Sequence, residues 1–127
     1  MITVQCKAPD FCRLSEEILA RGASIRFRAH GNSMAPFIKE GDLLVVTPFD
    51  ANQVGRGDVV LIRQGNRPLV HRVMRRYGEA GKTLSAKGDA HVTPDPPLPI
   101  DQVRGKITGI ERAGTALDIN GRILRLA

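Results

Sequence analysis

The sequence predicts a mainly β fold, a coiled and partly closed antiparallel sheet resembling a β-barrel, with one helix near the N-terminus. Three observations favour this class. Short apolar or alternating segments recur between turn-forming Gly, Pro, Asn and Asp residues along the 127-residue chain. Only one segment has a helical apolar repeat. Aromatic residues make up 4% of the sequence, so Val, Ile and Leu must form the core, and β-branched residues favour sheet.

The predicted helix covers residues 9–21. Asp10 is a candidate N-cap residue, and Gly22 is suited to the C-terminal cap. The apolar face of this helix consists of Phe11, Leu14, Ile18 and Leu19. These positions follow the helical repeat, so we expect the helix to pack across the sheet.

Strands are predicted at residues 24–30, 43–47, 59–62, 69–76, 83–86, 103–112, 115–119 and 122–126. The Asn120-Gly121 pair between the last two strands is a strong hairpin signal. Gly105 and Gly109 are candidate bulge positions in the long strand. Four prolines within residues 90–99 exclude a central strand there and predict an ordered loop or a peripheral crossing segment.

The length favours a single domain spanning residues 1–127. Residues 1–22 would form an N-terminal segment with the helix, and residues 23–127 the β-rich core that carries the site. No apolar stretch approaches the ~18 residues needed to cross a membrane, and residues 1–5 lack the basic flank of a signal peptide. We therefore expect a cytoplasmic protein, with peripheral membrane contact as the alternative.

The formal net charge is +6, but the Lys and Arg residues are scattered and often alternate with apolar ones. This pattern is typical of a solvated basic face, which could contact a membrane surface. Nucleic acid is not an expected partner, since few aromatic residues are present to stack on bases. The sequence does not predict an oligomeric state.

Cys6 and Cys12 are the only cysteines. A zinc site of the common kind needs further ligands at a recognisable spacing, and the sequence offers none. We therefore expect two reduced thiols, and we predict neither a metal nor a cofactor.

Ser33 is the candidate nucleophile, because it lies where a predicted strand enters a turn at residues 31–36. A serine hydroxyl is a weak nucleophile and needs an adjacent base that a third group orients. The chain has three histidines, His30, His71 and His91. His71 is the best candidate base, since a strand would hold it rigidly.

Four short motifs follow one another between residues 31 and 89: Gly31-Asn32-Ser33-Met34-Ala35-Pro36 with Gly41-Asp42, Gly57-Asp58-Val59-Val60-Leu61, Val70-His71-Arg72-Val73, and Lys87-Gly88-Asp89. Together with the spacing up to residue 95, they resemble the signal peptidase I family over about half of the chain. A histidine in place of the general-base lysine is similar to the archaeal, endoplasmic-reticulum and sporulation-type branch of that family.

The resemblance implies a role for each matching residue. Ser33 matches the nucleophile and His71 the general base. Asp95, six residues after Asp89, matches the acid that orients the histidine, with Asp89 supporting the site; the reverse assignment of the two aspartates stays open. Backbone N–H groups near Ser33 would form the oxyanion hole. The implied fold is that of signal peptidases and repressor proteases.

The leading hypothesis is a soluble serine endopeptidase that cleaves a precursor peptide or a partner protein. Two alternatives stay open: a self-cleaving repressor-like protease, which would use lysine where this chain has His71, and a non-catalytic peptide- or protein-binding module on the same fold. Two departures from the family bear on the substrate. A short amphipathic helix precedes the serine motif where relatives carry a transmembrane helix, and Ala90-His91 replaces the usual asparagines.

Overall fold

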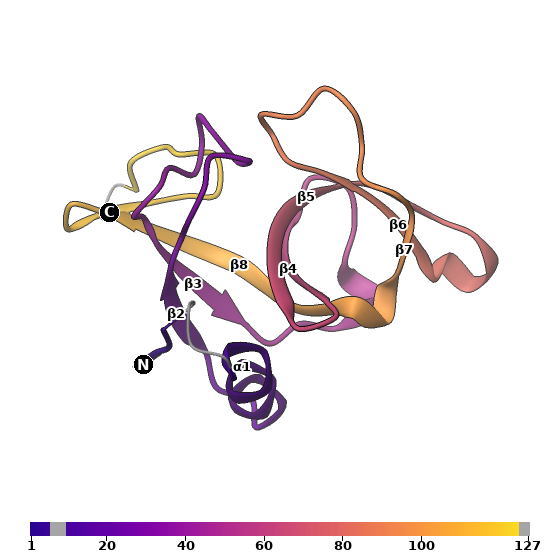
Figure 1. Ribbon diagram of the computed structural model, residues 1–127, viewed down its shortest axis with the longest axis horizontal. Coiled ribbons are helices and arrows are strands. Elements are labelled where there is room, and N and C mark those ends of the chain that lie inside the picture. The colour runs from indigo at the N-terminus through magenta and orange to yellow at the C-terminus, as the bar shows by residue number, and fades with distance from the viewer. Residues whose placement is uncertain (6–9, 125–127) are drawn as a thin grey trace.

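The computed structural model describes residues 1–5 and 10–124 of the chain (Figure 1). Cys6, the first residue of the expected helix and the end of the expected last strand lie outside the described residues. Cys12 has a free thiol that is buried. Burial raises the pKa of this thiol, a tendency that the nearby Arg63 opposes.

The mainly β class with one α-helix is confirmed. The elements are β1 (Ile2–Thr3), α1 (Phe11–Ala20), β2 (Ile25–Arg28), β3 (Leu43–Thr47), β4 (Val59–Gln64), β5 (Arg67–Tyr77), β6 (Thr83–Lys87), β7 (Leu98–Pro99), β8 (Val103–Arg112) and β9 (Thr115–Leu117), with three short 3-10 turns at Ala51–Gln53, Glu79–Gly81 and Ile100–Gln102. The strands form one sheet in the order β1-β2-β3-β8-β4-β5-β6-β7, and β9 pairs with β8.

The sheet is mixed and coiled, but it is not closed into a barrel. The β1–β2 pair is parallel, whereas the other strand pairs of the described chain are antiparallel. Strands β4 to β7 bend round a common centre (Figure 1), yet β1 and β7 remain the two ends of the strand order. β7 contains only Leu98 and Pro99, because proline lacks the N–H needed to extend a ladder.

Two apolar clusters fill the molecule, and β4 belongs to both. Val59 and Leu61 lie in the cluster that α1, β2, β3 and β8 build, while Val60 and Ile62 lie in the cluster that β5, β6 and β7 complete. All four side chains are at most 3% exposed. A strand buried on both faces has a continuous apolar run rather than an alternating one, which explains this stretch of sequence.

Helix α1 is tied to the sheet by charge as well as by its apolar face. Glu16 binds Arg63 of β4 at 2.6 Å and Arg104 of β8 at 2.7 Å. Asp10 stands at the N-cap position, but its side chain caps no backbone N–H and binds Arg13 at 2.9 Å instead.

Both glycines proposed as bulge points of β8 adjoin an irregularity. The register between β3 and β8 shifts beside Gly109, and the register between β4 and β8 shifts beside Gly105. Up to residue 124, where the description ends, the predicted terminal hairpin consists of β9 and a single bridge between Leu117 and Ile123. In this turn Asp118 accepts backbone hydrogen bonds that lower the pKa of its carboxyl group, from Arg122 above all.

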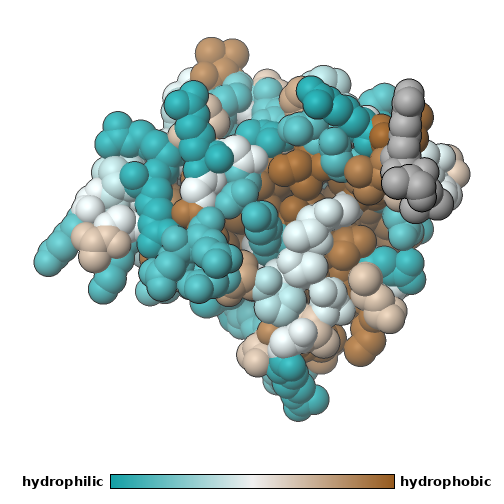
Figure 2. Space-filling model, turned by 180° about the vertical axis from the view of Figure 1, so that it is seen from behind, coloured by the Kyte–Doolittle hydropathy of each residue, from teal (hydrophilic) through white to brown (hydrophobic). Residues whose placement is uncertain are grey.

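The surface is unevenly polar. Figure 2 shows the face opposite to Figure 1, where hydrophobic residues reach the surface near the centre and hydrophilic residues cover the end at the left. Among the described residues, no helix combines the length and the apolar character required to cross a bilayer.

Candidate active site

The loop that carries Ser33 connects β2 to β3 and is closed at its base by the backbone. Ala29 donates its N–H to the carbonyl of Asp42 at 2.8 Å, and Gly41 donates to the carbonyl of Ala29 at 2.9 Å. Inside the loop, Met34 and Ile38 are buried in the first apolar cluster. These contacts hold a half-buried Ser33 at a defined place on the loop.

An ion pair fixes the far end of this loop to β8. Arg112 donates to both carboxylate oxygens of Asp42, at 2.9 and 2.8 Å, and to the carbonyl of Phe37 at 3.0 Å. Burial by itself would raise the pKa of the Asp42 carboxyl, but hydrogen bonds from Arg112 and from the Lys39 N–H outweigh it and lower the pKa. Asp42 is 3% exposed, so the pair is a structural anchor inside the Gly-Asp motif.

His71 lies on β5 opposite Val60 of β4, and its side chain is 3% exposed. Its Nδ1 is 2.5 Å from a carboxylate oxygen of Asp95. Asp95 is held in turn by its own N–H, which donates to the carbonyl of Ala86 at 2.8 Å. Among the described residues, the buried Nε2 of His71 has no hydrogen-bond partner.

Gly88 brings the serine loop and the histidine together. A Cβ atom on Gly88 would lie 2.6 Å from the Ser33 carbonyl oxygen and 3.0 Å from His71 Nε2. The next segment is hydrogen-bonded to the same loop, because Ala90 donates its N–H to the Ser33 carbonyl at 2.9 Å. Only a residue without a side chain leaves this space open.

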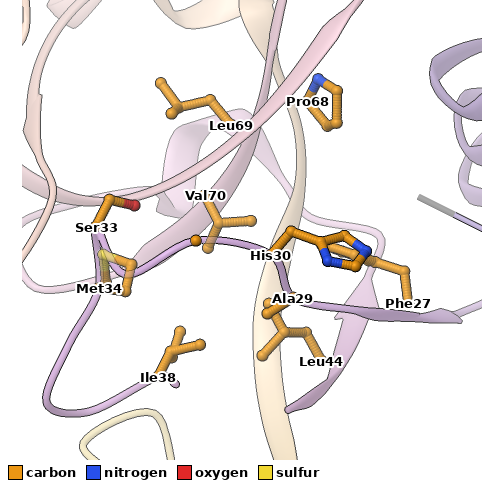
Figure 3. A pocket seen from close by; sticks show the side chains of 11 residues that line it. Phe27, Ala29, His30, Ser33, Met34, Ile38, Leu44, Pro68, Leu69 and Val70 are labelled. Carbon is orange, nitrogen blue, oxygen red and sulfur yellow. The ribbon is translucent and has the colours of Figure 1, made fainter. Parts of the chain in front are cut away.

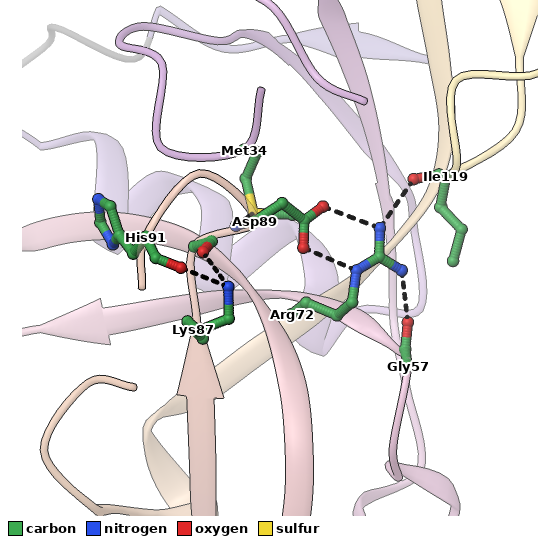
Figure 4. A network of polar contacts seen from close by, with 8 residues as sticks. Met34, Gly57, Arg72, Lys87, Asp89, His91 and Ile119 are labelled. Carbon is green, nitrogen blue, oxygen red and sulfur yellow. Dashed lines mark hydrogen bonds and ion pairs between the residues drawn. The ribbon is translucent and has the colours of Figure 1, made fainter. Parts of the chain in front are cut away.

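Asp89 contacts Arg72, and its neighbours are shown in Figure 4. Its two carboxylate oxygens accept from Arg72 Nε and Nη2 at 2.9 and 3.0 Å, and Arg72 also donates to the carbonyls of Gly57 and Ile119. The Asp89 N–H lies 3.4 Å from the sulfur of Met34, the residue after Ser33. Asp89 therefore joins three loops around the site.

A pocket of about 160 Å³ opens beside Ser33. Figure 3 shows Ser33 at one end of it and His30 apart from Ser33 on the far side. Its walls are mainly apolar, with Ile38 and Leu44 from one side of the site and Val70 from β5. The pocket therefore suits an apolar group next to the serine hydroxyl.

The other two histidines lie in different surroundings. His30 is on the pocket wall and its Nδ1 is 3.3 Å from Glu40, at an exposed position. The ring of His91 meets the ring of His71 edge to face, with the ring centroids 5.3 Å apart. The structure thus brings Ser33, His71 and His91 around Gly88 and places Asp95 on the other ring nitrogen of His71, while His30 and Asp89 have other partners.

Sequence reasoning missed the residues that support this arrangement. Arg112 and Arg72 are separated from Asp42 and Asp89 by 70 and 17 residues, and scattered arginines resemble a solvated face. The side-chain-free space at Gly88 depends on contacts from three segments. Only its place inside the Lys-Gly-Asp motif could have drawn attention to Gly88.

The described chain combines a β-rich domain, a loop serine and a buried histidine–carboxylate pair, which are residue types that serine peptidases use. Comparison with protein families agrees with this class. The sequence profile of the Peptidase S24-like family matches residues 2–104, and the chain belongs to this family.

Within known proteins, the chain is similar to fungal signal peptidase subunits. The chain is 43% identical over 70 residues to the signal peptidase complex catalytic subunit sec11 of Pyrenophora tritici-repentis and 41% identical to SEC11 of Leptosphaeria maculans. The matched part is 52% of this chain and 40% of each fungal protein. The likeness to signal peptidases is thus confirmed, and the chain spans well under half the length of these relatives in the match.

Proposed function

We propose that this protein is a serine endopeptidase in which Ser33 is the nucleophile, His71 the general base and Asp95 the residue that orients the base. One observation carries the proposal. His71 uses Nδ1 to bind Asp95 and keeps a buried Nε2 without a partner in the described chain, at the glycine that the Ser33 carbonyl also contacts.

The proposed chemistry follows from these positions. Ser33 Oγ attacks the scissile carbonyl carbon while its proton passes to His71 Nε2, and a tetrahedral oxyanion forms. When the intermediate collapses, the C–N bond breaks and the imidazolium returns the proton to the leaving amine. Water then hydrolyses the acyl-serine ester by the same base. Asp95 stabilises the imidazolium and fixes the tautomer with the proton on Nδ1.

The Ser33 backbone N–H is the proposed oxyanion donor. Within the described residues the Ser33 carbonyl accepts a hydrogen bond from Ala90, whereas no hydrogen bond from the Ser33 N–H is found. Donors of this kind, aimed at the developing charge, stabilise the transition state. Asp89 supports the site indirectly, because its pair with Arg72 holds the loop between Gly88 and Asp95.

The proposed substrate is a peptide segment with a small apolar side chain next to the scissile bond, since the pocket beside Ser33 is small and mainly apolar. The fungal relatives are named as catalytic subunits of a signal peptidase complex. By analogy we propose a precursor protein as substrate and accessory subunits as partners.

The test is a cleavage assay on a proteome-derived peptide library and on precursor proteins with N-terminal leaders, with products identified by mass spectrometry. Wild type, Ser33→Ala and His71→Ala are compared, and Ser24→Ala, immediately before β2, is the matched control. Cleavage should disappear in the first two variants and persist in Ser24→Ala.

Three outcomes would overturn or change the proposal. Cleavage that survives in Ser33→Ala excludes the serine mechanism. Equal peptide binding by wild type and Ser33→Ala, without a product, supports the binding module instead. A mass loss of the protein itself that requires Ser33 would identify self-cleavage as the reaction.

A further inference from the structure

The residues around the proposed catalytic base also form a candidate metal site. His71, His91 and Asp95 each offer one donor atom, and these three atoms lie within 4.8 Å of one another. Imidazole nitrogens suit zinc, which completes its coordination with water, and a ligating histidine commonly binds a carboxylate through its other ring nitrogen, as His71 does with Asp95. Magnesium and calcium prefer oxygen donors instead.

An independent observation points to a ligand at this place. His71 is almost fully buried, and its Nε2 has no partner in the described chain. A Cβ on Gly88 would lie 3.0 Å from this nitrogen and 2.9 Å from Nδ1 of His91. Two ring nitrogens from different segments therefore face the small space that the missing side chain leaves.

The backbone already holds His91 beside this space. Lys87 donates to the carbonyls of His91 and Gly88 at 2.6 and 2.9 Å (Figure 4), and His91 donates its N–H to the carbonyl of Gly88 at 2.9 Å. His91 is an exposed residue. Zn–N bonds are about 2.0 Å long, so we expect the His91 side chain to turn and place its nitrogen on an ion bound at His71 Nε2, with water completing the coordination.

We propose that His71, through Nε2, and His91 bind one Zn²⁺ ion, that Asp95 supports His71 from its Nδ1 side, and that this ion switches the peptidase off. Binding of the ion does not depend on the proposed function. The inhibition does, since an ion on His71 Nε2 occupies the nitrogen that must accept the Ser33 proton. The ion is thus a reversible inhibitor, and its removal by a chelator restores activity.

Binding is tested by titrating ZnCl₂ into chelator-treated protein in a calorimeter, with MgCl₂ as the hard-cation probe. Ser33→Ala is the background, because it keeps His71, His91 and Asp95 and prevents self-cleavage. One ion per chain should bind. Changing a second-shell partner of a metal ligand costs about 10- to 100-fold in affinity, so loss of a ligand in His91→Asn should weaken binding at least ~100-fold. His30→Asn is the matched control and should bind as the background does.

Histidine ring resonances in NMR give a readout separate from activity. Zn²⁺ should shift the signals of His71 and His91 and leave those of His30 in place. Unchanged affinity in His91→Asn, equal binding of Mg²⁺, or a shift at His30 instead of His91 would overturn the site.

Inhibition is measured as the ratio of cleavage rates with and without Zn²⁺, each variant against its own chelated rate. The ratio should fall in the wild type and stay near one in His91→Asn. Tight binding of Zn²⁺ without loss of activity would overturn the inhibition. A protein that binds Zn²⁺ but cleaves no peptide when chelated would refute the proposed peptidase function and leave the metal site intact.

Discussion

Substitution of Gly88 by alanine tests whether Ser33 and His71 act together. The added methyl group would lie 2.6 Å from the Ser33 carbonyl oxygen and 2.9–3.0 Å from ring nitrogens of His91 and His71. Ordinary contacts of such atoms are about 3.4 Å or more, so in a close-packed interior the Ser33 backbone must move by roughly 0.5 to 1 Å. His91 can turn aside, but the carbonyl is main chain and is held by Ala90.

A misplacement of this size at a catalytic centre costs about 10²-fold in rate. We therefore expect kcat/KM of Gly88→Ala to fall about 100-fold, with a loss of about 1 to 3 kcal/mol in the free energy of unfolding from overpacking. Cleavage of a peptide identified in the library screen measures the first quantity, and urea denaturation measures the second.

Two other glycines provide controls for this experiment. A Cβ on Gly55 meets nothing within 4 Å, so Gly55→Ala should be close to wild type. A Cβ on Gly105 would collide with Val46 in the core, so Gly105→Ala should lose stability but retain its rate per folded molecule. If folded Gly88→Ala cleaves as fast as Gly55→Ala, the inferred proximity of Ser33 and His71 is wrong.

Three further predictions concern the carboxylates. Asp95→Asn should lower kcat by about 10³- to 10⁴-fold without unfolding the protein, as expected for loss of the group that orients a catalytic histidine; a rate within tenfold of wild type would contradict this. Asp89→Asn should instead lower the free energy of unfolding by about 3 kcal/mol, because Arg72 loses its carboxylate partner, and denaturation followed by circular dichroism distinguishes the two aspartates. Asp42→Asn should destabilise the protein at pH 7: the pKa of Asp42 is lowered in the folded state, so its contribution is complete above the unfolded pKa of about 3.9 and disappears as pH falls through the lower folded pKa. The difference in melting temperature from wild type should therefore shrink in acid, and a constant difference would show that Asp42 acts by shape rather than by charge.

Strands with strong local signals were predicted well from the sequence. The bounds of Leu43–Thr47 and Val103–Arg112 were predicted without error, because alternation and flanking turn residues are local properties. β1 was missed because Ile2–Thr3 is only two residues long, and its pairing with β2 is a tertiary contact. The coiled, mainly β class was predicted as well; the proline-rich segment was recognised as unsuited to a central strand, but its contribution of the two-residue β7 at the end of the sheet was not predicted.

The candidate site could be predicted because four motifs follow one another in a recognisable order between residues 31 and 89. Ser33 was selected from its place at a strand-to-turn junction, His71 from its place on a strand, and Asp89 and Asp95 through the resemblance to the signal peptidase I family; their catalytic roles stay predictions. The sequence could not separate the two aspartates, because the choice depends on which way each side chain faces. In the structure Asp95 contacts His71 and Asp89 contacts Arg72. This difference is set by the course of the segment after β6.

The position of the site between the two apolar clusters explains why this segment matters. Met34 anchors the serine loop in the first cluster, whereas Val73 and Ala86, near His71 and Gly88, lie in the second. Strong packing within each cluster cannot by itself fix the distance between nucleophile and base. That distance depends on a few polar links from the loop after β6, including the hydrogen bond from Ala90 to Ser33. Substitutions in this loop should therefore impair catalysis more than stability, the opposite of what substitutions in either cluster would do.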